Sequence, residues 1–133
     1  MVQPEQVVVF HCRGMTDDDG TEAYLLLLCW AKRYLEPEQV VYIHCFSGTE
    51  YVYQRWIEAF PNLYCGFTNM VAGFRGEQLS AVRAVRSDRM VLETDAPYFK
   101  PRNAVCSTPQ CLMTGGEILE ECRVNAEKLF RLW

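Results

Sequence analysis

The chain has 133 residues, of which 50% are hydrophobic and 23% charged, and its formal net charge is −4. These totals predict one globular domain with its own core and exclude a disordered chain. A weakly acidic chain has no general attraction for nucleic acid or anionic membranes, so contact with nucleic acid would require a local patch or metal ions.

Four apolar runs predict β-strands at about residues 6–11, 40–45, 63–68 and 89–94. The first is a continuous β-branched and aromatic run, which is typical of a strand covered on both faces. Strands that alternate with helices favour a parallel sheet with right-handed crossovers. The sequence therefore predicts a single α/β domain over residues 1–133, built from four consecutive parallel βα units.

Helices are expected at about residues 20–34, 49–59, 77–85 and 116–132. Thr16 and the three aspartates after it fit the start of the first helix, because acids favour the positive helix end. Ser47 and Glu50 form an S-x-x-E pattern that predicts a capping box for the second. Residues 97–114 have the composition of a loop. The last helix is expected to bury a stripe of apolar residues, namely Ile118, Leu119, Cys122, Leu129 and Phe130.

The seven cysteines are scattered and never spaced as C-x-x-C, which predicts reduced thiols in a cytoplasmic or nuclear protein. The opening residues MVQPEQ have neither the basic nor the apolar part of a signal peptide. The longest apolar run, residues 23–31, is far shorter than the roughly 20 residues of a membrane span. We therefore expect no membrane partner.

His11 and His44 are the only histidines, and each ends an apolar strand and precedes a cysteine. A single buried histidine is more often structural than a ligand. Equivalent ends of neighbouring parallel strands point to the same rim, however, and two imidazoles there can bind a divalent metal ion. We predict that both histidines are metal ligands.

Asp95 follows the fourth apolar run, and Glu93 lies two residues before it. Asp95 could simply stabilise a turn, or it could ligate a metal ion and position a nucleophilic water. Glu93 is an unusual residue to bury, so it needs a partner or a catalytic role. We predict catalytic roles for both, and a metal-ligand role for Asp95.

Three further residues could bind a phosphate group. Ser47 and Gly48 precede a predicted helix, whose N-terminal N–H groups favour anions, although helix capping alone explains them. Arg13 follows Cys12 at the mouth of the expected crevice and could hold a phosphate with two hydrogen bonds, or be ordinary surface. A cysteine-phosphatase loop is excluded, because Tyr51 and Asp18 stand where its arginine is required.

The motifs IHCFSG, LETDAPY and NAEKLF, preceded by VVFHCR, together resemble the TatD family of metal-dependent deoxyribonucleases, in particular its animal TatD-domain-containing branch. The resemblance covers nearly the whole chain. It implies a (β/α)8 barrel of the metal-dependent hydrolase superfamily, of which these four units correspond to the C-terminal half. It also implies two divalent ions (Mg, Mn or Zn), with His11 and His44 on one and Asp95 on the other.

The chain departs from the family pattern, because it has neither the opening His-x-His pair nor the bridging glutamate. We expect a metal-dependent deoxyribonuclease of 3′–5′ exonuclease type, acting on DNA, with activity impaired by the missing half of the metal site. Two alternatives stay open: an inactive interaction or regulatory domain that retains the fold, and another metal-dependent hydrolase of the superfamily. The open apolar sheet edges also predict self-association.

Overall fold

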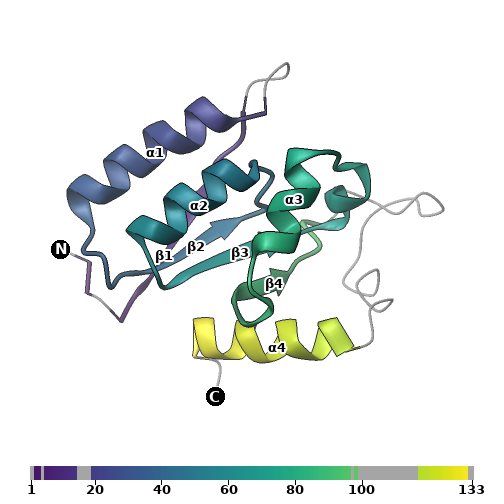
Figure 1. Ribbon diagram of the computed structural model, residues 1–133. Helices are drawn as coiled ribbons and strands as arrows, with labels where there is room; N and C mark the ends of the chain where they lie inside the picture. Colours follow the sequence, from purple (N-terminus) through teal and green to yellow (C-terminus); the bar gives the residue numbers. More distant parts are fainter. Residues whose placement is uncertain (1, 4, 15–18, 97, 99–116, 132–133) are drawn as a thin grey trace.

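The computed structural model describes residues 2–3, 5–14, 19–96, 98 and 117–131 (Figure 1). Strands and helices alternate along the chain, with two short 3-10 helices between them. The elements are β1 (Val7–His11), α1 (Thr21–Tyr34), β2 (Val40–His44), α2 (Glu50–Ala59), β3 (Leu63–Phe67), η1 (Asn69–Gly73), α3 (Glu77–Ala84), η2 (Ser87–Arg89), β4 (Met90–Leu92) and α4 (Glu117–Phe130).

The four strands form one parallel sheet in the order β1-β2-β3-β4, so the predicted α/β fold is confirmed. This chain-order arrangement is that of an arc of a (β/α)8 barrel. Each predicted strand overlaps the observed one, although β4 is only three residues long. His11 of β1 pairs with His44 of β2, as the equivalent strand ends predicted.

One face of the sheet, called the outer face here, is covered by α1, α2 and α3 (Figure 1). Strand alternation directs Val41, Ile43 and Cys65 to this face. Helix α1 meets it with Tyr24, Leu28 and Ala31, which recur at helical spacing. These residues belong to the larger of two hydrophobic clusters, with Trp56 of α2 fully buried among them.

The opposite face, called the inner face here, is partly covered by α4. Tyr42, Tyr64 and Val91 point to this face and form a second, smaller cluster with Leu129 of α4. The predicted α4 stripe is only partly confirmed: Cys122 and Leu129 are buried, but Phe130 is 42% exposed. The side chains of residues 118 and 119 lie outside the described part of the chain.

One prediction about helix starts differs from the structure, and another is confirmed in its described part. The cap of α2 is Thr49, whose hydroxyl accepts the N–H of Val52 at 3.3 Å, so the Ser47–Glu50 capping box was wrong. Helix α1 begins after Gly20, whose φ of 75° suits glycine. The Asp19 carboxylate accepts the N–H of Thr21 at 2.9 Å there, whereas residues 16–18 lie outside the described part.

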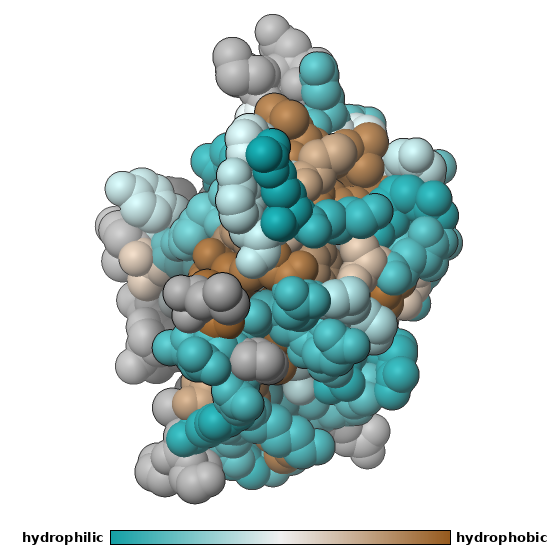
Figure 2. Space-filling view, turned by 90° about the vertical axis from the view of Figure 1, so that its left-hand side faces the viewer, coloured by the Kyte–Doolittle hydropathy of each residue, from teal (hydrophilic) through white to brown (hydrophobic). Residues whose placement is uncertain are grey.

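The β1 edge is less covered than its apolar sequence predicted. Val9 is 47% exposed, so β1 is not buried on both faces. Figure 2 faces the side on which α1 and β1 lie, and apolar atoms show there between polar ones. Leu26 of α1 adds to the exposed apolar surface, with 60% of its area accessible. The expected self-association through this edge stays a prediction.

No helix among the described residues is both long enough and apolar enough to cross a membrane.

Candidate active site

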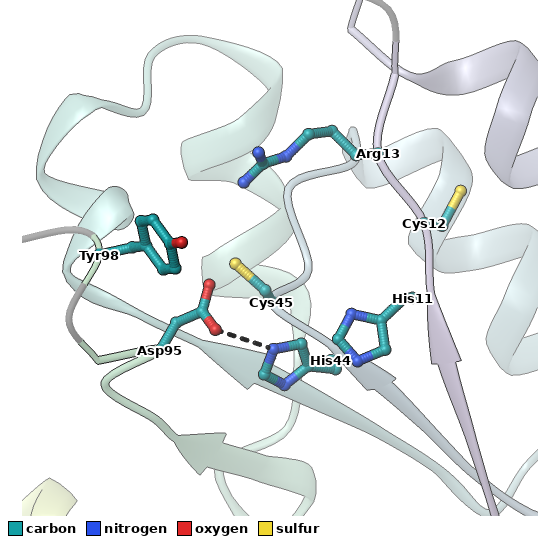
Figure 3. Close-up of a pocket in the computed structure, with 7 residues that line it drawn as sticks. All are labelled: His11, Cys12, Arg13, His44, Cys45, Asp95 and Tyr98. Atoms are coloured by element: carbon teal, nitrogen blue, oxygen red, sulfur yellow. Dashed lines mark ion pairs between the residues drawn. The ribbon is translucent and has the colours of Figure 1, made fainter.

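A cavity of about 510 Å³ opens where the strands end at the carboxyl edge of the sheet (Figure 3). Side chains reach it from the ends of β1 and β2 and from the segment after β4. Its described lining consists of His11, Cys12, Arg13, His44, Cys45, Asp95 and Tyr98. Residues far apart in the sequence are thus brought together at the edge where parallel α/β proteins carry their chemistry.

The two histidines lie side by side in this cavity. Their ring centroids are 4.3 Å apart and the ring planes are inclined by 45°. This proximity follows from the parallel register, which places His11 directly beside His44. The His44 side chain is only 18% exposed, so its two nitrogens have protein groups as their neighbours.

Glu93 lies behind His44, away from the cavity lining. One carboxylate oxygen contacts Nδ1 of His44, and the other accepts the backbone N–H of Cys45 at 2.6 Å. A carboxylate against an imidazole nitrogen favours a proton on that nitrogen. This contact favours hydrogen on Nδ1 of His44, which would leave Nε2 as the nitrogen that can bind a metal ion or accept a proton.

Tyr42 adds a third polar group behind His44. Its hydroxyl lies against the Glu93 carboxylate, beside Gly66. Burial raises the pKa of the Tyr42 hydroxyl well above its ordinary value, and the negative charge of Glu93 raises this pKa further. The hydroxyl therefore stays protonated and is available to donate to the carboxylate.

Asp95 faces the other nitrogen of His44. Its Oδ1 lies 3.5 Å from His44 Nε2, and its side chain is 34% exposed. Asp95 and Cys45 both have positive φ, 47° and 52°, a conformation that non-glycine residues rarely adopt. Strained backbone of this kind is commonly found at functional sites, and here both residues line the cavity.

The three predicted phosphate-binding residues are separated. Arg13 lines the cavity, whereas Ser47 and Gly48 are not among its described lining residues. The N–H of Ser47 donates to the Tyr24 hydroxyl at 3.1 Å, so that backbone donor already has a partner. Gly48 is buried, and an added Cβ would lie about 3.0 Å from the Phe46 ring. Phosphate binding by these residues stays a prediction.

The sequence reading missed Cys12, Cys45 and Tyr98 as lining residues. The signal for the cysteines was present, because each directly follows a predicted ligand histidine. Burial raises the pKa of both thiols, with smaller contributions from neighbouring groups at Cys45. Protonated thiols are weak nucleophiles, which agrees with the exclusion of a cysteine-phosphatase loop.

The chemistry of the donors fits a divalent ion only in part. His11, His44 and Asp95 supply two imidazoles and a carboxylate to one cavity, and Glu93 supports one imidazole from behind, as is usual at metal centres. Within the described part of the chain, however, no three or more His, Cys, Asp or Glu side chains are grouped closely enough to hold a metal ion. The roles assigned to these residues stay predictions.

The fold and the site define a parallel α/β protein with imidazoles and carboxylates at the carboxyl edge of its sheet. Residues 3–131 match the family described as TatD related DNase. The chain belongs to this family.

Named relatives of the chain are nucleases. The human 3′-5′ RNA nuclease TATDN2 is 33% identical over 102 residues, which are 76% of this chain and 12% of that protein. The 3′-5′ ssDNA/RNA exonuclease TatD of Erwinia billingiae is 32% identical in an alignment 145 positions long, which covers 94% of this chain and 52% of that protein. The chain thus spans about half the length of the bacterial relative and a much smaller part of the human one.

One solved structure is also similar, the crystal structure of an uncharacterized amidohydrolase from Saccharomyces cerevisiae. It is 28% identical, covers 52% of this chain and 19% of that chain, and has a TM-score of 0.42. At this score the likeness carries no weight for the fold.

Proposed function

We propose that this chain carries part of the active site of a metal-dependent nuclease that removes nucleotides from the 3′ end of single-stranded DNA. The observation that carries the proposal is the position of His44, held at Nδ1 by Glu93 and facing Asp95 at Nε2 inside the cavity. The family match and the nuclease names of the relatives support it. Those names include RNA, so RNA is the competing substrate.

His11, His44 and Asp95 are the residues that would hold the metal ion, with magnesium, manganese and zinc as candidates. A bound divalent ion lowers the pKa of water and neutralises charge on a phosphate group. The protein residues then have separate tasks. Glu93 orients the His44 ring through its contact with Nδ1, and Asp95 would accept a proton from an attacking water.

Arg13 and Tyr98 are proposed to bind the substrate. Both line the cavity (Figure 3). A guanidinium group can hold a phosphate with two hydrogen bonds. The Tyr98 ring is 68% exposed, and exposed aromatic rings are platforms on which unpaired bases stack. Both features suit an unpaired 3′ end better than a duplex.

The first test is metal binding by calorimetry with Mg²⁺, Mn²⁺ and Zn²⁺, repeated with His44→Ala and Asp95→Ala. We expect each substitution to weaken binding by about 10–100-fold or to abolish it. Asp88→Asn is the matched control, because Asp88 forms an exposed ion pair with Arg86 at 2.7 Å, and such pairs contribute little.

The second test follows the 3′ shortening of 5′-labelled single-stranded DNA and RNA oligonucleotides, with and without EDTA. The proposal requires cleavage that EDTA removes and that both site variants reduce, while Asp88→Asn retains it.

An inactive domain that retains the family fold is the second candidate. It is favoured by the lack of a closed group of three ligands among the described residues. Metal binding that is absent, or unchanged in His44→Ala and Asp95→Ala, would support this candidate and contradict the nuclease proposal.

A further inference from the structure

Gly66 is a glycine in the middle of a buried strand. All five residues of β3 are buried, and an interior glycine weakens a strand because it supplies no packing surface. Gly66 is not among the described glycines with positive φ, so the backbone conformation does not demand glycine. The requirement for glycine at this position must come from the space beside it.

That space is filled by two side chains from the strands on either side. A Cβ added at Gly66 would collide with the Glu93 carboxylate and with the Tyr42 hydroxyl. Tyr42 belongs to β2, and Glu93 follows β4, so the two groups meet above the strand that separates their own.

Glu93 reaches His44 only by crossing β3. Its backbone N–H donates to the Phe67 carbonyl of β3 at 2.9 Å, which fixes the start of the side chain one strand away from β2. Its carboxylate nevertheless contacts His44 Nδ1 and accepts the Cys45 N–H, both at the end of β2. Any side chain at position 66 would stand in this path.

We propose that Gly66 and Tyr42 are positioning residues that hold Glu93 on His44 and thereby fix the His44 ring with hydrogen on Nδ1 and Nε2 toward Asp95. Gly66 acts by leaving the path open. Tyr42 acts through its hydroxyl, which lies against the Glu93 carboxylate. The use of the fixed ring in catalysis depends on the proposed nuclease function, but the geometry itself does not.

Nitrogen-15 NMR of the histidine side chains tests the proposal, because the whole chain has only two histidines. The spectra are recorded at about pH 8.5, above the ordinary pKa of imidazole. A His11→Asn variant assigns the two rings. We expect the wild-type His44 ring to carry its proton on Nδ1, and Glu93→Ala to remove this preference, which validates the readout.

Gly66→Ala is expected to remove the Nδ1 preference, and Tyr42→Phe to weaken it. Gly73→Ala is the matched control, because a Cβ added at Gly73 would meet nothing within 4 Å beyond the adjacent residues and its own helix backbone. It should leave the His44 spectrum unchanged. A His44 ring that keeps its proton on Nδ1 in both Gly66→Ala and Tyr42→Phe would overturn the proposal.

Gly66→Ala could also destabilise the strand in a general way. This effect is distinguished from a collision with Glu93 and Tyr42 by removing those two groups. In a Tyr42→Phe/Glu93→Ala background both colliding polar groups are gone, so adding Gly66→Ala should shift the urea midpoint much less than in the wild type. An equal shift in both backgrounds would place the strain elsewhere and contradict the proposal.

The outcome is independent of the nuclease assay. A His44 spectrum that changes as expected in a chain that neither binds metal nor cleaves DNA would retain the positioning role and refute the proposed function. Metal-dependent cleavage together with a His44 spectrum that does not respond to Gly66→Ala or Tyr42→Phe would support the proposed function and refute the positioning role.

Discussion

The two faces of the sheet carry different kinds of residue, although the same strands supply both. On the outer face, Val41 and Ile43 of β2 pack with Trp56 in an apolar core under three helices. On the inner face, Tyr42 and His44 of the same strand lie beside hydroxyl, imidazole and carboxylate groups. The alternation of one strand therefore supplies packing to one side and polar chemistry to the other.

This division makes the register of β2 a requirement for stability and for function alike. A slip of one residue would exchange Ile43 with His44 and place an imidazole in the apolar core. The comparison also predicts where substitutions are tolerated. Changes on the outer face should cost stability, whereas changes around His44 should mainly affect the site.

The largest expected effect is the loss of Trp56 from the outer face. Its side chain is fully buried, its ring packs against Phe10 and Phe60, and its Nε1 donates to the Tyr24 carbonyl at 3.2 Å. Trp56→Ala should lower the free energy of unfolding by about 3–5 kcal/mol, because it leaves a large cavity. Urea unfolding followed by circular dichroism measures this.

Trp30→Ala provides the control for the same substitution at an exposed site. Trp30 is 49% exposed and stacks on Tyr34, with ring centroids 5.8 Å apart. Its loss should cost less than about 1 kcal/mol. Equal effects at the two tryptophans would show that the outer face is not the main source of stability.

Leu129 tests the packing of α4 on the inner face. It is 3% exposed and packs with Tyr42, Tyr64 and Val91. Leu129→Ala should lower the free energy of unfolding by about 2–3 kcal/mol in urea unfolding, in the lower part of the usual range because the cluster is small.

Phe130→Ala is the control on the same helix. It should lower the free energy of unfolding by only about 0.5–1.5 kcal/mol, because this ring is half exposed and touches Tyr42 edge-on, with centroids 5.6 Å apart. A larger effect at Phe130 than at Leu129 would mean that α4 presents a different side to the sheet.

The strand positions and the pairing of His11 with His44 could be predicted from the sequence, because they depend on local patterns. An apolar run that ends in a histidine marks both the strand and its carboxyl end. Parallel connections then bring equivalent ends together without knowledge of individual contacts. The same reasoning brought Asp95 and Arg13 to the cavity.

Interactions between distant side chains could not be predicted in this way. No local pattern shows that Gly66 leaves room for Glu93, because the two residues are 27 positions apart in sequence and meet only in the folded sheet. The cap of α2 was misassigned because Ser47 and Thr49 are both good capping residues, and a tertiary contact from Tyr24 occupies the turn at Ser47. The face on which α4 packs is likewise a tertiary property.

Each face of the sheet buries a tyrosine hydroxyl, Tyr24 on the outer face and Tyr42 on the inner face, and their ionisation makes the stability depend on pH. Burial raises the pKa of Tyr24 to about 12, although its contacts with Ser47 partly oppose the shift. The raised pKa means that the folded chain favours the protonated Tyr24 hydroxyl. The stability that depends on this hydroxyl is therefore fully present below about pH 10 and is lost as the pH rises to about 12.

At pH 11 the loss from Tyr24 should be about 1.4 kcal/mol relative to pH 9. Tyr42 on the inner face adds to the loss, because its pKa is also raised by burial and by Glu93. Tyr24→Phe should therefore reduce the alkaline loss of stability without abolishing it, and urea unfolding of both proteins at pH 9 and 11 measures the difference. If the variant and the wild type lost the same stability, the Tyr24 hydroxyl would have to be accessible to water in the folded chain, and the outer face would be less tightly packed than the inner one.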